Sequence, residues 1–127
     1  MVQIAFIFFK RITTVAVLAF MTTGVAAAAD NFGAIAFSKA TGGYGFVYDR
    51  QSRREAENGA MRECRSRTSG CQVAVWFRNG CGAVAIGSNG WGSEPGATRQ
   101  AAERAARRKC SRYTNGCQVL AWSCTSR

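Results

Sequence analysis

The chain has 127 residues, and its 17 basic and seven acidic residues give a net charge of +10. It contains no histidine, which excludes Ser-His-Asp and Cys-His catalysis. Six cysteines in so short a chain are typical of an exported, disulfide-stapled domain. Cofactor binding is not expected. The C-x6-C spacing and the lack of histidine argue against a metal site, for which a cysteine-only zinc site is the remaining alternative.

The first 29 residues have the order of a secretory signal peptide. Lys10-Arg11 precedes an uncharged apolar run, Ile12 to Val25, and four alanines, 26–29, end it. We expect cleavage near Ala29, which leaves a single exported domain at 30–127 that is periplasmic or extracellular. A retained membrane anchor is the alternative, but the apolar run is short for a spanning helix. No transmembrane segment is expected after cleavage, and the remaining net charge is +8.

The rest of the chain repeats itself with an offset of 46 residues. Residues 52–64 read SRREAENGAMREC and residues 98–110 read TRQAAERAARRKC. A second cysteine and a similar apolar run ending in tryptophan follow each segment, at 71–76 and 117–122. We therefore divide the domain into repeat one, 33–81, and repeat two, 82–127.

Repeat one predicts two strands, a helix and a strand. Residues 33–38 have the residue alternation of a strand, and a turn is expected at 41–43. Residues 44–48 are expected to form a second strand, with aromatic residues at every other position. The helix at 52–64 begins with the capping box Ser52 and Glu55. Its small residues at 56, 60 and 64 share one face, which lets it lie close to a sheet. The strand at 71–76 completes the repeat.

Repeat two follows the same order with one difference. Asn79-Gly80 is a hairpin signal, so the strand at 71–76 is expected to pair antiparallel with a strand at 82–87. Residues 90–92 are too short and glycine-rich to predict a second strand, and we expect a loop there. Thr98 caps the helix at 98–110, and 117–122 form the last strand.

These elements predict an α+β fold. Two ββαβ-like repeats form one mainly antiparallel sheet, and both helices pack on one face of it. The matched cysteines reduce the 15 possible pairings to one expectation: Cys64–Cys71, Cys110–Cys117 and, by default, Cys81–Cys124. Trp76 and Trp122, matched on strands, are expected in the core.

The candidate binding residues lie in repeat two. Arg104, Arg108 and Arg112 recur every four residues with Arg107 beside them, opposite the alanine face of the helix. Like charges so spaced repel one another, and an anionic partner would relieve that cost. An ordinary solvated helix face is the competing interpretation. Trp91 is expected in a loop, where it either contacts a partner or covers the open end of the sheet.

The strand at 34–38, the cysteine–tryptophan pattern at 64–76, the segment 81–87, Trp91-Gly92 and the closing cysteines 110, 117 and 124 resemble the bacterial domain-of-unknown-function family numbered 4189. The resemblance covers 33–125. It implies a small exported domain and carries no catalytic residues.

We therefore expect a non-enzymatic binding module for an acidic protein or an anionic envelope polymer, which includes an inhibitor or immunity protein. Nucleic acid is not expected as the partner, and no oligomeric state is predicted. The alternative is a histidine-free hydrolase acting on a glycan or RNA through Asp49 or Glu94, one of which would then lie in a cleft with a raised pKa.

Overall fold

The computed structural model describes residue 24 and residues 29–127. Within them the chain forms two consecutive β-β-α-β units. The first contains β1 (Phe32–Ser38), β2 (Tyr44–Arg50), α1 (Arg53–Arg65) and β3 (Cys71–Arg78), and the second contains β4 (Cys81–Ile86), β5 (Trp91–Gly96), α2 (Arg99–Ser111) and β6 (Gln118–Cys124). The predicted signal peptide lies almost entirely outside the described residues.

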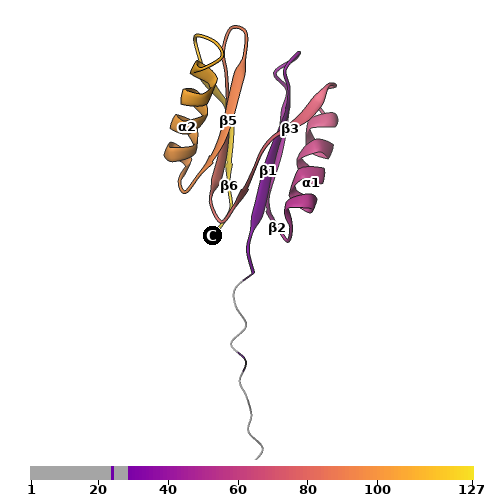
Figure 1. Ribbon diagram of the computed structural model, residues 1–127. Coiled ribbons are helices and arrows are strands. Elements are labelled where there is room, and N and C mark those ends of the chain that lie inside the picture. The colour runs from indigo at the N-terminus through magenta and orange to yellow at the C-terminus, as the bar shows by residue number, and fades with distance from the viewer. Residues whose placement is uncertain (1–23, 25–28) are drawn as a thin grey trace, which may run out of the picture.

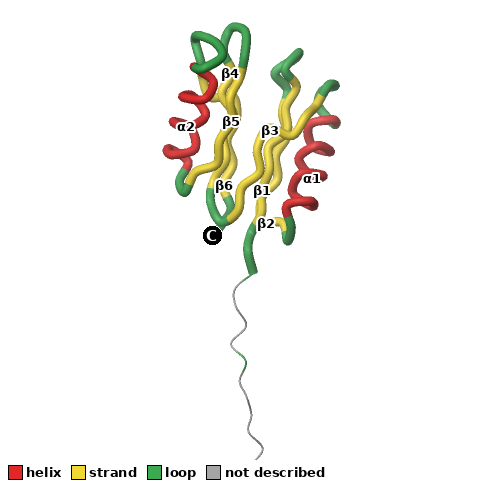
Figure 2. The backbone as a smooth tube through the Cα atoms, in the orientation of Figure 1, coloured by secondary structure: helices red, strands yellow, loops and turns green. Residues whose placement is uncertain are grey.

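Each unit builds its own three-stranded antiparallel sheet, with the strand orders β2-β1-β3 and β5-β4-β6. The two sheets face each other, and one helix covers the outer side of each (Figure 1). The molecule therefore has the layers helix, sheet, sheet, helix (Figure 2). The α+β fold built from two ββαβ repeats is confirmed. The prediction of a single sheet with both helices on one face is wrong, because the strands form two sheets.

The composition of the central strands explains the two sheets. β1 directs Ala34 and Ala36 toward α1, whereas Ile35 and Phe37 belong to the layer between the sheets. β4 repeats this division, with small residues toward α2 and Val84 in the shared layer. A helix on one face of a single sheet would leave the bulky residues of the other face in water. The two units instead bury those faces against each other.

The connection between the units is a turn, but it does not join two paired strands. Asn79 has a left-handed φ of 48°. Its backbone N–H donates to the carbonyl of Asn31 at 2.9 Å, and its side-chain oxygen accepts from the Asn31 N–H at 2.9 Å. Asn79 thus extends the pairing of β1 with β3, and the chain then crosses to the other sheet. The predicted pairing of the strands on either side of Asn79-Gly80 is therefore wrong.

The helices begin as predicted and lie close to their sheets. The Ser52 hydroxyl accepts from the Glu55 N–H at 3.1 Å, and Thr98 accepts from the Ala101 N–H at 3.1 Å. The Glu55 carboxylate turns back to the Gln51 N–H at 3.3 Å, one residue before the expected capping-box donor. The small residues predicted to face the sheets are all fully buried: Ala56, Ala60, Cys64, Ala102, Ala106 and Cys110.

The three disulfides Cys64–Cys71, Cys81–Cys124 and Cys110–Cys117 are those predicted from the repeat. Two of them tie the end of a helix to the start of the following strand. The third joins directly opposed residues of β4 and β6.

Candidate binding surface

The outer face of α2 carries a group of basic side chains without acidic partners, which we call the basic face: Arg104, Arg107, Arg108 and Arg112. All four side chains are exposed, and within residues 29–127 none of them makes an ion pair. Glu103, the expected counter-charge for Arg107, instead accepts from the Arg99 guanidinium at 2.6 Å. The basic face is therefore a concentration of positive charge directed into solvent.

The equivalent surface of α1 is different. The positions 46 residues earlier hold Asn58, Met61, Arg62 and Ser66. α1 contains four basic and three acidic residues, whereas α2 contains five basic and one acidic residue. Two helices with the same fold and the same contacts to their sheets thus differ in net charge by three. The basic face belongs to repeat two and is not required by the architecture.

A cleft of about 870 Å³ lies at the C-terminal end of α2, where the two sheets end. Its lining includes the half-buried Trp91, whose ring packs edge-to-face on the buried Phe37 with the centroids 4.8 Å apart. The β1–β2 and β4–β5 turns form its walls, and Lys109 and Tyr113 from the end of α2 complete it. The cleft gives the basic face a hollow, partly aromatic neighbour.

Trp91 is half-buried at the first position of β5, so the prediction of a loop at 90–92 is wrong. The strand forms despite its glycines because β4 supplies a continuous antiparallel register, from Ile86 opposite Trp91 to Cys81 opposite Gly96. The glycines are themselves needed, because a Cβ on Gly92 would lie 2.3 Å from the backbone nitrogen of Cys110. Trp91 covers the open end of the layer between the sheets and also lines the cleft.

A second hollow, of about 570 Å³, follows the adjoining edges of β3 and β5. It shares Ala74, Ser93 and Lys109 with the cleft. The Ser93 hydroxyl donates to the Ala74 carbonyl at 2.5 Å and joins the two sheets at this boundary. Lys109 pairs with Glu94 of β5 at 3.1 Å, which holds its ammonium group beside both hollows. The two hollows adjoin at the Ser93–Ala74 bond, and together we call them the groove.

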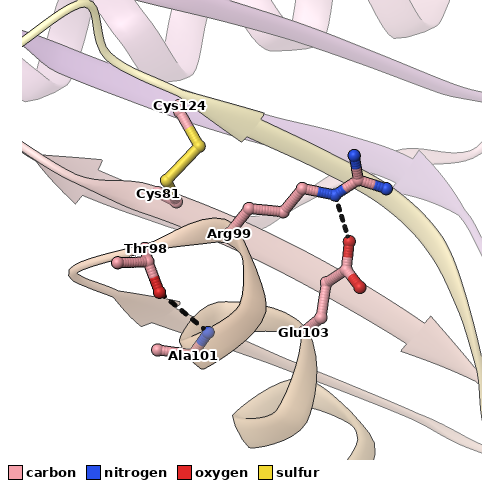
Figure 3. A network of polar contacts seen from close by, with 6 residues as sticks. All are labelled: Cys81, Thr98, Arg99, Ala101, Glu103 and Cys124. Atoms are coloured by element: carbon pink, nitrogen blue, oxygen red, sulfur yellow. Dashed lines mark hydrogen bonds and ion pairs between the residues drawn. A yellow bond between two sulfur atoms is a disulfide. The ribbon is translucent and has the colours of Figure 1, made fainter.

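Trp76 and Trp122 are not core residues, and that prediction is wrong. Their side chains are 36% and 39% exposed. Each lies on the helix side of an edge strand, where the helix covers the two neighbouring strands more fully. An arginine from the first turn of the helix covers part of each ring instead: Arg53 lies 4.5 Å from the ring centroid of Trp76, and Arg99 lies 3.9 Å from that of Trp122. Figure 3 shows Arg99 held by Glu103 beside the Thr98 cap.

The two carboxylates of the hydrolase hypothesis are separate and already engaged. Asp49 accepts hydrogen bonds from the hydroxyl and the backbone N–H of Ser126, and these bonds lower its pKa below the ordinary value. A general acid requires the opposite shift. Glu94 is paired with Lys109. The hydrolase alternative thus has no support in the described residues.

Sequence reasoning missed three residues of the cleft, namely Lys39, Lys109 and Tyr113. Lys109 and Tyr113 replace Glu63 and Arg67 of the first repeat. These differences between the two copies were a signal that could have identified them. The role of Lys39 depends on the packing of one sheet against the other, which no local pattern shows.

A family model described as "Domain of unknown function (DUF4189)" matches residues 32–124. Among solved structures, the chain is similar to the NMR structure of Rv1813c from Mycobacterium tuberculosis, with a TM-score of 0.55 and 22% sequence identity. That match covers 98% of this chain and 97% of the other, and it shows a shared fold. No curated protein matches the chain. Within the described residues, no helix is long and apolar enough to cross a membrane.

Proposed function

The chain belongs to the DUF4189 family, a domain family of unknown function, and we propose that this member is an exported, non-enzymatic module that binds an anionic partner. The observation that carries the proposal is the basic face, whose four arginines are exposed and make no ion pair within residues 29–127. Like charges one turn apart destabilise a helix, and a bound anion relieves that repulsion while accepting charge-assisted hydrogen bonds.

Two further observations support export and a binding role. All six cysteines are joined in disulfides, which persist in oxidising compartments outside the cytoplasm. The pKa of Asp49 is lowered, which takes this carboxyl away from the pKa range that acid catalysis uses. The partner class is an acidic protein or an anionic envelope polymer, and a stapled scaffold of this kind suits an inhibitor or immunity protein.

The experiment compares two triple variants that remove the same charge from the two sister helices. R104Q/R108Q/R112Q changes the basic face of α2. R54Q/R62Q/R65Q removes three exposed arginines of α1 that likewise make no ion pair in the described part of the chain. The disulfide-bonded protein is titrated against heparin and against polyglutamate by calorimetry at a series of salt concentrations. Heparin and polyglutamate represent the two partner classes.

We expect the α2 variant to weaken binding to at least one polyanion about 3- to 150-fold, because each of the three exposed ion pairs contributes about 0.2–1 kcal/mol. The α1 variant should bind almost as well as the unchanged protein. Binding should also weaken as salt rises. Equal losses in the two variants, or binding that ignores both salt and the α2 arginines, would contradict the proposal.

A further inference from the structure

We propose that the groove between the two sheets holds the sugar rings of an acidic glycan whose charged groups bind the basic face. This inference rests on the proposed function and adds a second part of the site and a ligand class. It is argued from the shape of the groove, the chemistry of its lining and its position beside α2.

The cleft has the size and composition of a ligand site. Its volume of about 870 Å³ lies within the usual range of small-molecule pockets, about 300–1,000 Å³. The second hollow extends it by about 570 Å³ along the edges of β3 and β5. An elongated ligand that binds in the cleft can therefore continue along the edges of β3 and β5, passing over the Ser93–Ala74 bond.

The lining of the cleft matches a sugar ring in two respects. The half-buried Trp91 and the exposed Tyr113 supply aromatic rings at the cleft, and the C–H face of a sugar packs favourably on the electron-rich face of such a ring. Exposed short polar side chains lie beside these rings and are suited to hydroxyl groups: Thr41, Ser88 and Asn89. An acidic polypeptide presents no such combination of an apolar ring face and a hydroxyl rim.

The charges around the cleft select an acidic glycan over a neutral one. Lys39 is exposed on the β1–β2 turn and makes no ion pair within residues 29–127. On the opposite side, Lys109, which is paired with Glu94, lines the cleft one helical turn from Arg112 of the basic face. Among the described residues, unpaired positive charge thus lies on both sides of the cleft, at Lys39 and at Arg112. A polymer whose rings occupy the cleft can place its carboxylate or sulfate groups on that face.

Tyr113 connects the two parts of the surface and provides the sharpest variant. Its side chain lies at the cleft and is 66% exposed, so its removal should leave the fold intact. Tyr48 is 49% exposed and lines neither hollow, which makes it a matched control. The variants are therefore Y113S and K39Q in the cleft, Y48S as the control, and the α2 triple variant of the proposed function.

The probes are tetragalacturonate as the acidic glycan, a neutral chitotetraose, and tetraglutamate as an acidic peptide. Binding is measured by calorimetry, and the indole N–H signal of Trp91, assigned through W91F, is followed by NMR. We expect tetragalacturonate to shift that signal and tetraglutamate to leave it unchanged. Y113S combined with K39Q should weaken tetragalacturonate binding about tenfold, and Y48S should not. Chitotetraose should bind much more weakly than the acidic glycan.

The outcomes separate this inference from the proposed function. If the cleft variants bind tetragalacturonate normally while the α2 triple variant does not, the basic face is a binding surface but the cleft is not the glycan site. If tetraglutamate shifts the Trp91 signal as strongly as tetragalacturonate, the ligand class is wrong. If chitotetraose binds as tightly as tetragalacturonate, the selection for charge is wrong. If the α2 triple variant binds every acidic probe normally, the proposed function itself fails.

Discussion

Among single residues, Arg99 shows how a partly exposed tryptophan is covered in this protein. Its Nε donates to Glu103, one turn along α2, and this bond fixes the guanidinium plane over the ring of Trp122. Arg53, Glu57 and Trp76 repeat the arrangement in the first unit. Because the arrangement occurs in both copies, it belongs to the scaffold, whereas the basic face occurs in one copy alone.

We predict that Arg99→Ala lowers the free energy of unfolding by about 0.5–1 kcal/mol, the usual contribution of an exposed cation–π contact. The ring of Trp122 should also become more accessible to acrylamide, which fluorescence quenching measures. Arg104→Ala removes an arginine from the same helix that lies over no ring, and it should change neither quantity. Identical behaviour of the two variants would show that Arg99 does not cover the tryptophan.

Within the elements, the contact between helix and sheet depends on the absence of side chains. A Cβ added to Gly45 or Gly92 would lie 2.3 Å from the backbone nitrogen of Cys64 or Cys110. Both obstacles are helix backbone, which cannot rotate away as a flexible side chain can. The alanines of each helix and of its sheet make the same close approach possible. The distance between each helix and its sheet is therefore fixed by these backbone contacts.

We predict that Gly92→Ala destabilises the protein by about 1–3 kcal/mol, the usual cost of overpacking, in urea-induced unfolding. Gln100→Ala, an exposed change on α2, should stay within about 0.5 kcal/mol of the unchanged protein. Gly45→Ala should reproduce the larger loss, because the contact is the same in both units. If Gly92→Ala is as stable as Gln100→Ala, the close approach of α2 to its sheet is wrong.

The helices and the strand β5 show what local sequence can and cannot predict about elements. Ser52 and Thr98 mark the helix starts because a cap satisfies backbone donors within one turn, so the signal is local. β5 contains three poor strand residues, Gly92, Pro95 and Gly96, and it exists because of its pairing with β4. That pairing is a tertiary effect, and propensity alone does not reveal it.

For the whole molecule, the disulfides differ in the length of chain that they close. Cys81–Cys124 spans 43 positions, and each of the other two spans 7. In the loop-entropy model these bonds contribute about 4 and about 2.5 kcal/mol. We predict that C81A/C124A lowers the urea midpoint more than C64A/C71A does, with a difference in stability of about 1.5 kcal/mol. Each pair has one buried and one partly buried cysteine, so the loss of packing is comparable. An equal loss would contradict a dominant effect of loop length.

At this scale, the sequence did not predict how the two units are arranged. Asn79-Gly80 has the local pattern of a hairpin, but the bonds to Asn31 and the bulky inner faces of β1 and β4 decide the strand pairing. The candidate site was predicted in part for the same reason. The arginines follow helix periodicity, whereas the cleft arises where two sheets diverge, and no single segment contains it.

The apolar layer between the sheets makes each repeat dependent on the other. One repeat alone would expose Ile35, Phe37 and Phe77 to water, so a single unit would need a partner that covers that face. Here the cover is the other repeat of the same chain, where a dimer would use a second subunit. Because the two repeats are separate segments of one chain, their outer faces can differ, and only α2 carries the four arginines of the basic face.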